Sequence, residues 1–306
     1  MTSKLNFEKL VRRKLPSQIQ SAIKENYFFR TYRAQQIGTS RNRLDLCAAE
    51  TANYLFHCQP LKKYPLHDKV CLEIGTGWVL SHSLVLYLLG AKKVYSTDIT
   101  RLLILSAIPK AISSSVQYII NDCLAGFEKH ELIRARLDKL CSIDKFTLET
   151  LKEIGIEYIA PIDLVQEPLD KKVDFIYSKA VLEHIPKNEI TQLLNNLISN
   201  LSENGIMFHL IHLEDHLDIA NKPFDFLAES DEYFTKEMQN QRGNRIRRSH
   251  WDNIFSSVDN LDHQFVFEWS RLNKNLPDKI DESIHYIDEA DLRVSHIGVF
   301  GKKKSK

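Results

Sequence analysis

The sequence predicts an α/β fold, with a doubly wound, largely parallel sheet that carries helices on both faces. Short β-rich runs alternate with helical segments over the middle of the 306-residue chain, and most of these runs end at a glycine or a polar residue. Two further β-rich runs stand apart near the end of the chain. The five early strands are expected at residues 69–74, 94–97, 156–162, 173–177 and 206–211. The two late runs, 263–269 and 293–300, are expected to pair antiparallel at a sheet edge.

Two segments between these strands have the hydrophobic pattern of a packed helix. Residues 78–89 are almost continuously apolar, and Gly90 follows them as an expected C-cap. Residues 187–201 place leucine and isoleucine at helical spacing on one face. Each helix therefore connects two strands of the same sheet.

The rest of the chain is expected to surround this sheet. Residues 1–68 are predicted to form an N-terminal helical cap, and residues 69–306 the main domain. The connection at about 101–155 is too long for a simple crossover. Its later part has the pattern of a charged amphipathic helix, so we expect a helical insertion. The irregular segment at about 214–262 is expected to lie on the substrate side.

Composition excludes several classes of protein. With 41 Lys+Arg and 40 Asp+Glu, the chain has a net charge of +1, and no overall field draws it to nucleic acid or to an anionic membrane. Five dispersed cysteines without a CxxC pair argue against a disulfide framework and a zinc site, so no metal is expected. The apolar run at 79–91 is too short to span a bilayer. We expect a cytoplasmic location without membrane insertion.

The sharpest local motif is KVCLEIGTGW at residues 69–78. Gly75 and Gly77 follow a strand and precede a helix, where bare backbone admits a ligand and free N–H groups are available. Asp98, about 20 residues further on, ends the second strand and is placed to bind two ribose hydroxyls. The simpler alternative is a tight turn at the glycines, with Asp98 as a helix N-cap.

Two kinds of ligand compete for this motif. A dinucleotide site uses G-x-G-x-x-G, but Leu80 occupies the position of the third glycine. Glu73, two positions before the first glycine, would repel a pyrophosphate and would tolerate a ligand that carries an ammonium group. The motif therefore favours a cationic ligand over a dinucleotide.

The ordered set of motifs resembles the class I S-adenosylmethionine-dependent methyltransferases, which have a Rossmann-like fold with a terminal antiparallel hairpin. E-x-G-x-G in LEIGTG, the two strand-end aspartates and VDFIYSKAVLEHI at 173–185 match the family in order, over residues 69–216. The resemblance implies S-adenosyl-L-methionine as the cofactor. The cofactor-binding residues that it implies are Glu73, Gly75, Gly77, Asp98, Asp163 and Ser178.

A second resemblance concerns the acceptor. HLIHLEDH at 209–216 and NRIRRSHWDNIF at 244–255 are similar to bacterial methyltransferases associated with saccharide or surface-glycan biosynthesis. His212 departs from this pattern, because an Asp is frequent there. The resemblance implies a small-molecule or glycan-precursor acceptor, methylated at oxygen.

Three residues are candidates for removing a proton from such an acceptor: His184, Asp215 and His216. All follow strand ends that are expected to face the cleft. Each also has a structural interpretation, as a packed histidine or a residue that closes a loop. The basic cluster at 242–250 could bind a phosphate, but a solvated charged face is the simpler interpretation.

Two other functions stay open on the sequence alone. One is a nicotinamide-dependent oxidoreductase, and the other is a non-catalytic binding protein on the same fold. Nucleic acid is disfavoured as the acceptor, because residues after the fourth strand lack an Asn-Pro-Pro-aromatic run. The sequence names neither the acceptor nor the oligomeric state.

Overall fold

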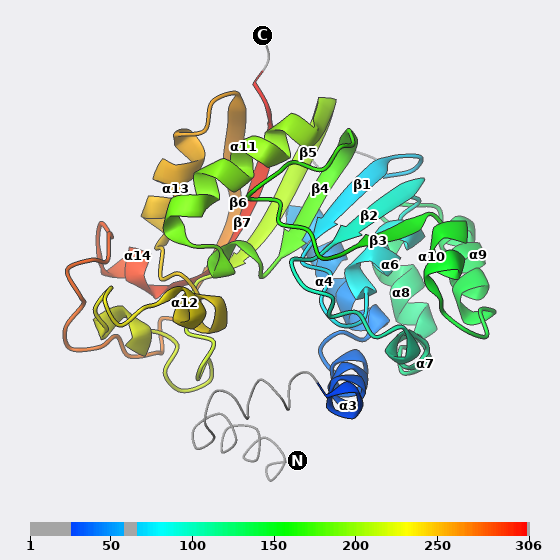
Figure 1. Ribbon diagram of the computed structural model, residues 1–306, viewed down its shortest axis with the longest axis horizontal. Coiled ribbons are helices and arrows are strands. Elements are labelled where there is room, and N and C mark those ends of the chain that lie inside the picture. The colour runs from blue at the N-terminus through cyan, green and yellow to red at the C-terminus, as the bar shows by residue number, and fades with distance from the viewer. Residues whose placement is uncertain (1–25, 58–65, 305–306) are drawn as a thin grey trace.

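A computed structural model describes residues 26–57 and 66–304 of the chain. Their strands form one mixed seven-stranded sheet in the order β3-β2-β1-β4-β5-β7-β6 (Figure 1). The strands are β1 (Val70–Ile74), β2 (Lys93–Thr97), β3 (Ile156–Ile159), β4 (Val173–Lys179), β5 (Leu201–His212), β6 (Leu261–Ser270) and β7 (Val294–Lys303). The first five pair in parallel, and β7 lies antiparallel between β5 and β6. The predicted Rossmann-like sheet with a terminal antiparallel hairpin is confirmed.

The helices cover both faces of this sheet (Figure 1). They are α3 (Tyr27–Gly38), α4 (Leu44–His57), α6 (Ser81–Leu88), α7 (Ile108–Ser113), α8 (Gln117–Leu124), α9 (His130–Cys141), α10 (Leu148–Glu153), α11 (Ile190–Asn200), α12 (Lys236–Arg242), α13 (Arg248–Ser256) and α14 (Glu289–Arg293). Single 3₁₀ turns are η1 (Leu105–Ala107), η2 (Leu182–His184), η3 (Lys187–Glu189) and η4 (Asp225–Ala228). None of the helices within 26–57 and 66–304 combines the length and the hydrophobicity that a membrane crossing requires.

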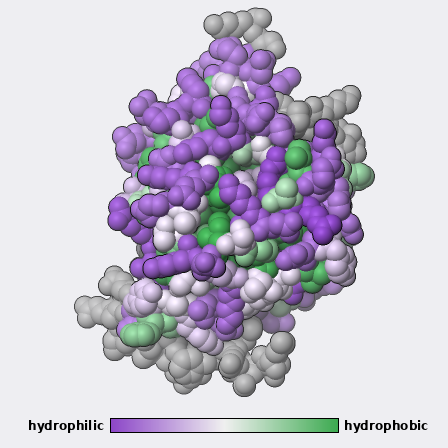
Figure 2. Space-filling model, turned by 90° about the vertical axis from the view of Figure 1, so that its right-hand side faces the viewer, coloured by the Kyte–Doolittle hydropathy of each residue, from purple (hydrophilic) through white to green (hydrophobic). Residues whose placement is uncertain are grey.

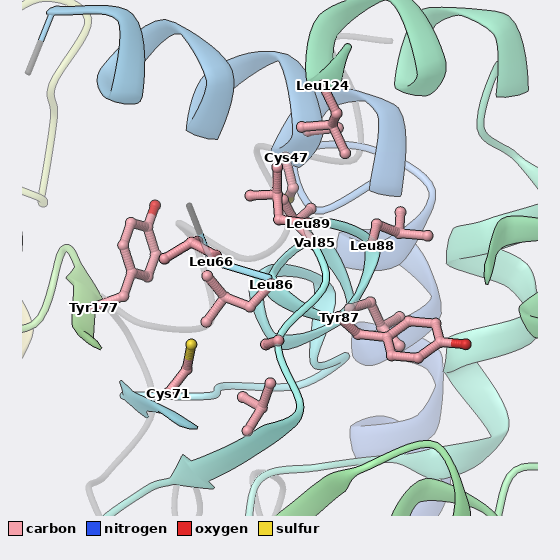
Figure 3. Packing of buried hydrophobic residues seen from close by; sticks show 14 of the residues in the cluster. Cys47, Leu66, Cys71, Val85, Leu86, Tyr87, Leu88, Leu89, Leu124 and Tyr177 are labelled. Atoms are coloured by element: carbon pink, nitrogen blue, oxygen red, sulfur yellow. The ribbon is translucent and has the colours of Figure 1, made fainter. Parts of the chain in front are cut away.

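Strand alternation divides the core into two layers. Phe175 and Tyr177 of β4 pack with α4, α6, α8 and α9 on one face, whereas Ile176 packs with α11 and α13 on the other. Figure 3 shows the first layer, where Cys47 of α4 meets the side chains of α6. Helix α4 also contacts the sheet through Tyr54, whose ring stacks 5.5 Å from that of Phe267. Helix α4 is thus part of the main core; the predicted boundary at residue 68 stays a prediction.

Several predicted element boundaries differ from the structure. Of the helix expected at 187–201, residues 187–189 form η3, and β5 begins at Leu201, directly after α11, and not at residue 206. The helix predicted to begin at residue 78, α6, begins at Ser81, because Leu80 adopts a left-handed conformation with φ 58° and lengthens the preceding loop. Strand β3 ends at Ile159 and not at residue 162, since Pro161 has no N–H for the ladder and restricts the residue before it. Gly90, with φ 92°, follows α6 as expected of a C-cap glycine.

The long connection between β2 and β3 contains η1 and the helices α7 to α10, which agrees with a helical insertion. Helix α9 buries Ile133, Leu137 and Leu140 against the core. Arg136 of α9 donates from Nη1 to the carbonyl of Leu88 at 2.9 Å, and so binds an unpaired carbonyl at the end of α6. The outward side of this region is mostly hydrophilic (Figure 2). The N-terminal residues 1–25 of the predicted cap lie outside the described residues.

The basic cluster at 242–250 is not a solvated charged face, so that interpretation is wrong. Arg242, Arg245 and Arg247 are buried. Arg242 and Arg245 form ion pairs with carboxylates of the preceding segment, and Arg247 donates from Nη2 to the carbonyls of Leu213 and Val294. These arginines hold the segment after β5 against the sheet.

Candidate functional site

A cavity of about 420 Å³ opens at the carboxyl ends of β1 to β4. This volume falls in the range of roughly 300–1,000 Å³ that is typical of small-molecule sites. Its location is the one expected for ligands of parallel α/β sheets. The residues that line it come from four strand exits, from the turns η2 and η3 and from the helices α11 and α12: Ile74, Gly75, Thr97, Asp98, Ile99, Thr100, Leu102, Ile162, Asp163, Leu164, Val165, Ala180, Val181, His184, Ile185, Pro186, Glu189, Leu193 and Asn240.

The two glycines of the first motif have different surroundings. Gly75 lines the cavity with φ 76°, and a Cβ placed there would lie 2.4 Å from Cγ2 of Val181. Gly77 has φ 68°, and a Cβ there would meet no atom within 4 Å among the described residues. Gly75 is therefore required for both conformation and space, whereas Gly77 is required for conformation and leaves its backbone open.

Asp98 and Asp163 line the cavity, as predicted for strand-end carboxylates. Asp98 is buried; its Oδ2 accepts from the N–H of Gly77 at 2.9 Å and its Oδ1 from the N–H of Thr100 at 3.0 Å. Asp163 accepts from the N–H of Val165 at 3.0 Å. These bonds fix the orientation of both carboxylates and leave lone pairs for a ligand.

Glu73 lies outside the cavity lining. Its carboxylate accepts from Oγ of Ser83 on α6 and from Oγ of Ser96 on β2 at 3.0 Å. The side chain is only 2% exposed, and this burial raises its pKa to about 7. In this position Glu73 connects β1, β2 and α6 behind the glycine loop, residues 75–80, which holds Gly75 and Gly77.

Ser178 also lies outside the cavity lining. It is fully buried, and its Oγ lies 2.7 Å from Nδ1 of His209 on the neighbouring strand β5. Burial lowers the pKa of His209 to about 3, so this imidazole is neutral at pH 7. Of the six predicted cofactor residues, the structure thus brings three to the cavity and sets Gly77 beside Asp98.

His184 and His216 lie together, and His184 lines the cavity. Their ring centroids are 4.8 Å apart. Glu183, next to His184, is buried, and its Oε1 lies 3.9 Å from Nε2 of His216. Burial raises the pKa of Glu183 to about 8 and lowers that of His216 to about 2. The two candidate histidines therefore share one environment that is largely shielded from solvent.

Asp215 is occupied by an ion pair. Arg242 donates from Nε to Oδ1 at 3.0 Å and from Nη2 to Oδ2 at 2.6 Å, and Asp215 also accepts from the N–H of Leu217. This bidentate pair connects the loop after β5 to α12, which provides Asn240 to the cavity. The geometry gives Asp215 a positioning role, and its catalytic role stays a prediction.

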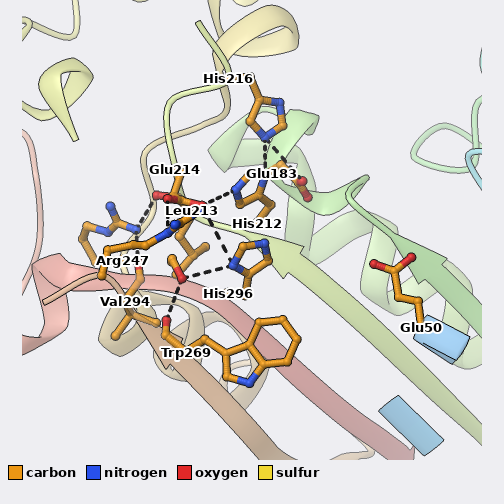
Figure 4. Close-up of polar contacts among 12 residues, drawn as sticks. Glu50, Glu183, His212, Leu213, Glu214, His216, Arg247, Trp269, Val294 and His296 are labelled. Carbon is orange, nitrogen blue, oxygen red and sulfur yellow. Dashed lines mark hydrogen bonds and ion pairs between the residues drawn. The ribbon is translucent and has the colours of Figure 1, made fainter. Parts of the chain in front are cut away.

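Sequence reasoning missed a group of residues beside these histidines: Glu214, His296 and Arg271. Figure 4 shows His212 between His216 and Glu214. The His212 and His296 rings stack 4.3 Å apart, because β5 and β7 pair these two residues directly. Arg271 donates to Glu214 at 3.0 Å. His209 and His212, three residues apart, lie on opposite faces of β5: the first contacts Phe255 and the second this group. Only the strand register could have revealed His296.

The cavity is acidic. Three carboxylates line it, from Asp98, Asp163 and Glu189, and none of its described lining residues is a lysine or an arginine. A pyrophosphate would have no cationic side chain there to balance its charge. The side chains suit a neutral or cationic ligand that donates hydrogen bonds.

No protein-family model matches the chain, and no curated protein matches it in sequence. Among solved structures, magnesium protoporphyrin IX methyltransferase from Synechocystis with bound SAH is 14% identical, with a TM-score of 0.44, over 98% of this chain and 94% of that one. A Nostoc punctiforme protein named as a candidate O-methyltransferase is 12% identical, with a TM-score of 0.44, over 88% of this chain. The match spans 60% of the Nostoc protein's length. At these identities and TM-scores, the matches carry no weight for the function of this chain.

Proposed function

We propose that this protein is an S-adenosylmethionine-dependent methyltransferase. The observation that carries the proposal is the cavity at the strand exits, which is lined by Gly75, Asp98 and Asp163 and by no described lysine or arginine. The ordered motifs of the sequence independently resemble the same class. An acidic cavity of this kind favours a sulfonium cation with an uncharged nucleoside over a dinucleotide.

The residues present fit this cofactor. Asp98 would accept from ribose hydroxyls, and Asp163 from an adenine amine, because both carboxylates are already oriented by backbone N–H groups. Gly77 keeps open backbone beside Asp98. When bound, the cofactor supplies an activated methyl group, which leaves the protein chiefly to align an acceptor.

We further propose an oxygen nucleophile on a small molecule as the acceptor. An imidazole within hydrogen-bond reach of a hydroxyl can take its proton as the new bond forms. His184 lines the cavity and lies against His216, so this pair is our candidate for the base. The saccharide acceptor suggested by the sequence stays a prediction, since no feature of the cavity selects a sugar.

Calorimetry with S-adenosylmethionine, S-adenosylhomocysteine and NAD tests the cofactor. We expect the two adenosyl ligands to bind and NAD not to bind. Asp98→Asn and Asp163→Asn should each weaken binding by about 10-fold to 100-fold, because hydrogen bonds to a charged group are worth about 1.5–3 kcal/mol. Asp170→Asn is the matched control, since Asp170 is fully exposed and lies outside the cavity.

The same titration distinguishes the alternatives. Binding of NAD without S-adenosylmethionine would establish the oxidoreductase hypothesis instead. If the adenosyl ligands bind, a screen of hydroxylated acceptors that measures release of S-adenosylhomocysteine separates an enzyme from a binding protein. His184→Ala should then lower turnover and leave cofactor affinity nearly unchanged.

A further inference from the structure

We propose that Glu183, His212 and His216 form a binding site for one divalent transition-metal ion, at the exits of β4 and β5 beside the cavity. Each residue offers one ligand atom, and these atoms all lie within 4.8 Å of one another. The dispersed cysteines gave no reason to expect such a site. It is assembled by histidines and a carboxylate from two separate segments of the chain.

The distances between these ligand atoms lie on either side of the spacing that ligand atoms have around a bound ion. Nδ1 of His212 lies 2.8 Å from Nε2 of His216, which in turn lies 3.9 Å from Oε1 of Glu183. Ligands bound tetrahedrally to zinc at about 2.0–2.1 Å are on the order of 3.3 Å from one another. The first pair would have to separate slightly and the second to close slightly, while the third pair, Glu183 and His212, lies within 4.8 Å. Figure 4 shows His212 and Glu183 both directed toward His216.

The orientation of His212 is the one that a metal ligand requires. Its Nε2 lies 2.7 Å from Oε2 of Glu214, a fully buried carboxylate that is also held by Arg271. Donation from Nε2–H to Glu214 leaves the lone pair of Nδ1 directed at His216. A histidine that ligates a metal through one nitrogen usually donates its other N–H to a carboxylate in this way.

Glu183 supplies the second, independent observation. Its side chain is 1% exposed, and neither carboxylate oxygen has a hydrogen-bond partner among the described residues. A buried carboxylate without partners is strongly unfavourable. Two nearby cations form ion pairs with other carboxylates: Lys179 pairs with Glu50, and Arg271 with Glu214. A metal ion between Glu183 and the two histidines would satisfy this group.

The ligand set indicates the kind of ion. Two imidazole nitrogens and one carboxylate oxygen suit zinc, and also iron(II) or cobalt(II), rather than magnesium or calcium. Three protein ligands leave a coordination position for water or for a substrate oxygen. If the proposed methyl transfer is correct, that position would hold the acceptor oxygen next to His184. Binding of the ion itself does not depend on that function.

The test is a titration of the full chain, stripped with a chelator, with Zn²⁺ in a calorimeter and with Co²⁺ followed by its visible absorption. We expect one ion per chain. Glu183→Gln, which keeps the shape of the side chain, and His216→Ala should each weaken binding by more than about 100-fold. Glu214→Gln should weaken it by about 10-fold to 100-fold, the usual effect of losing a carboxylate that orients a ligand.

His250→Ala is the matched control, because His250 lies against another histidine, His285, elsewhere in the protein. It should bind as the wild type does, and circular dichroism of every variant shows whether it is folded. Equal affinity in Glu183→Gln, His216→Ala and the wild type would overturn the proposal. So would a loss of binding in His296→Ala, which would assign the ion to His212, Glu214 and His296 instead. Zinc binding without S-adenosylmethionine binding would refute the proposed function and leave the metal site intact.

Discussion

Replacement of Glu73 by glutamine should change how the stability of this protein depends on pH. The folded-state pKa of Glu73 is about 7, against an ordinary value of 4.5. The folded state therefore binds this proton more tightly than the unfolded state, so the contribution is fully present below pH 4.5 and is lost as the pH rises to about 7. The two pKa values differ by about 2.5. A difference of one in pKa corresponds to about 1.36 kcal/mol, so this difference changes the free energy of unfolding by about 3 kcal/mol.

Glu73→Gln keeps the side-chain volume and an oxygen for Ser83 and Ser96, but it cannot ionise. Urea unfolding across pH 4.5 to 7 gives the stability of each protein, and the difference between variant and wild type isolates Glu73 from other titrating groups. That difference should grow by about 3 kcal/mol in favour of the variant as the pH rises. Glu153→Gln, at an exposed position of α10, should show a nearly constant difference. A constant difference for Glu73→Gln would refute the reasoning.

Two other predictions concern the glycine loop and the segment after β5. Gly75→Ala should destabilise the protein by about 2–5 kcal/mol, because it combines left-handed backbone strain with a clash against Val181. Gly77→Ala should cost only about 1–2 kcal/mol, because it adds the strain without a clash. Thermal melts compare the two variants, and equal losses of stability would contradict the packing argument. Asp215→Ala should lower the free energy of unfolding by about 3 kcal/mol, because it removes one of the two carboxylate partners of the buried Arg242. Chemical denaturation measures this loss. Unchanged stability together with lost turnover would instead support a catalytic role for Asp215.

The sequence predicted the sheet well because strand ends are marked by local chemistry. Asp98 and Asp163 follow β2 and β3, where the chain leaves the sheet, so their side chains reach the cavity. Glu73 and Ser178 stand one residue before the last residue of their strands. A residue inside a strand faces one side of the sheet, and these two face the buried layers. Position along a strand is visible in a sequence, but the direction of a side chain at its end is not.

The histidine group shows a different limit of sequence reasoning. His212 and His216 are close in sequence, whereas His296 lies far along the chain and meets His212 through the β5–β7 register. The buried arginines were misread for a similar reason. Their partners, such as Asp231 for Arg245, lie in a segment whose path no periodic pattern reveals. Charge alone could not distinguish a solvated face from a set of buried ion pairs.

The cavity and the proposed metal site are consequences of one feature of the sheet. Strands β4 and β5 pair in parallel, so their exits lie at the same edge. The exit of β4 supplies Glu183 and His184, and that of β5 supplies His212 and His216. His184 lines the cavity while its ring lies against His216, so it belongs to both places. If the proposed methyl transfer to oxygen is correct, an ion held there would lie beside the acceptor, where the oxygen nucleophile has to lose its proton.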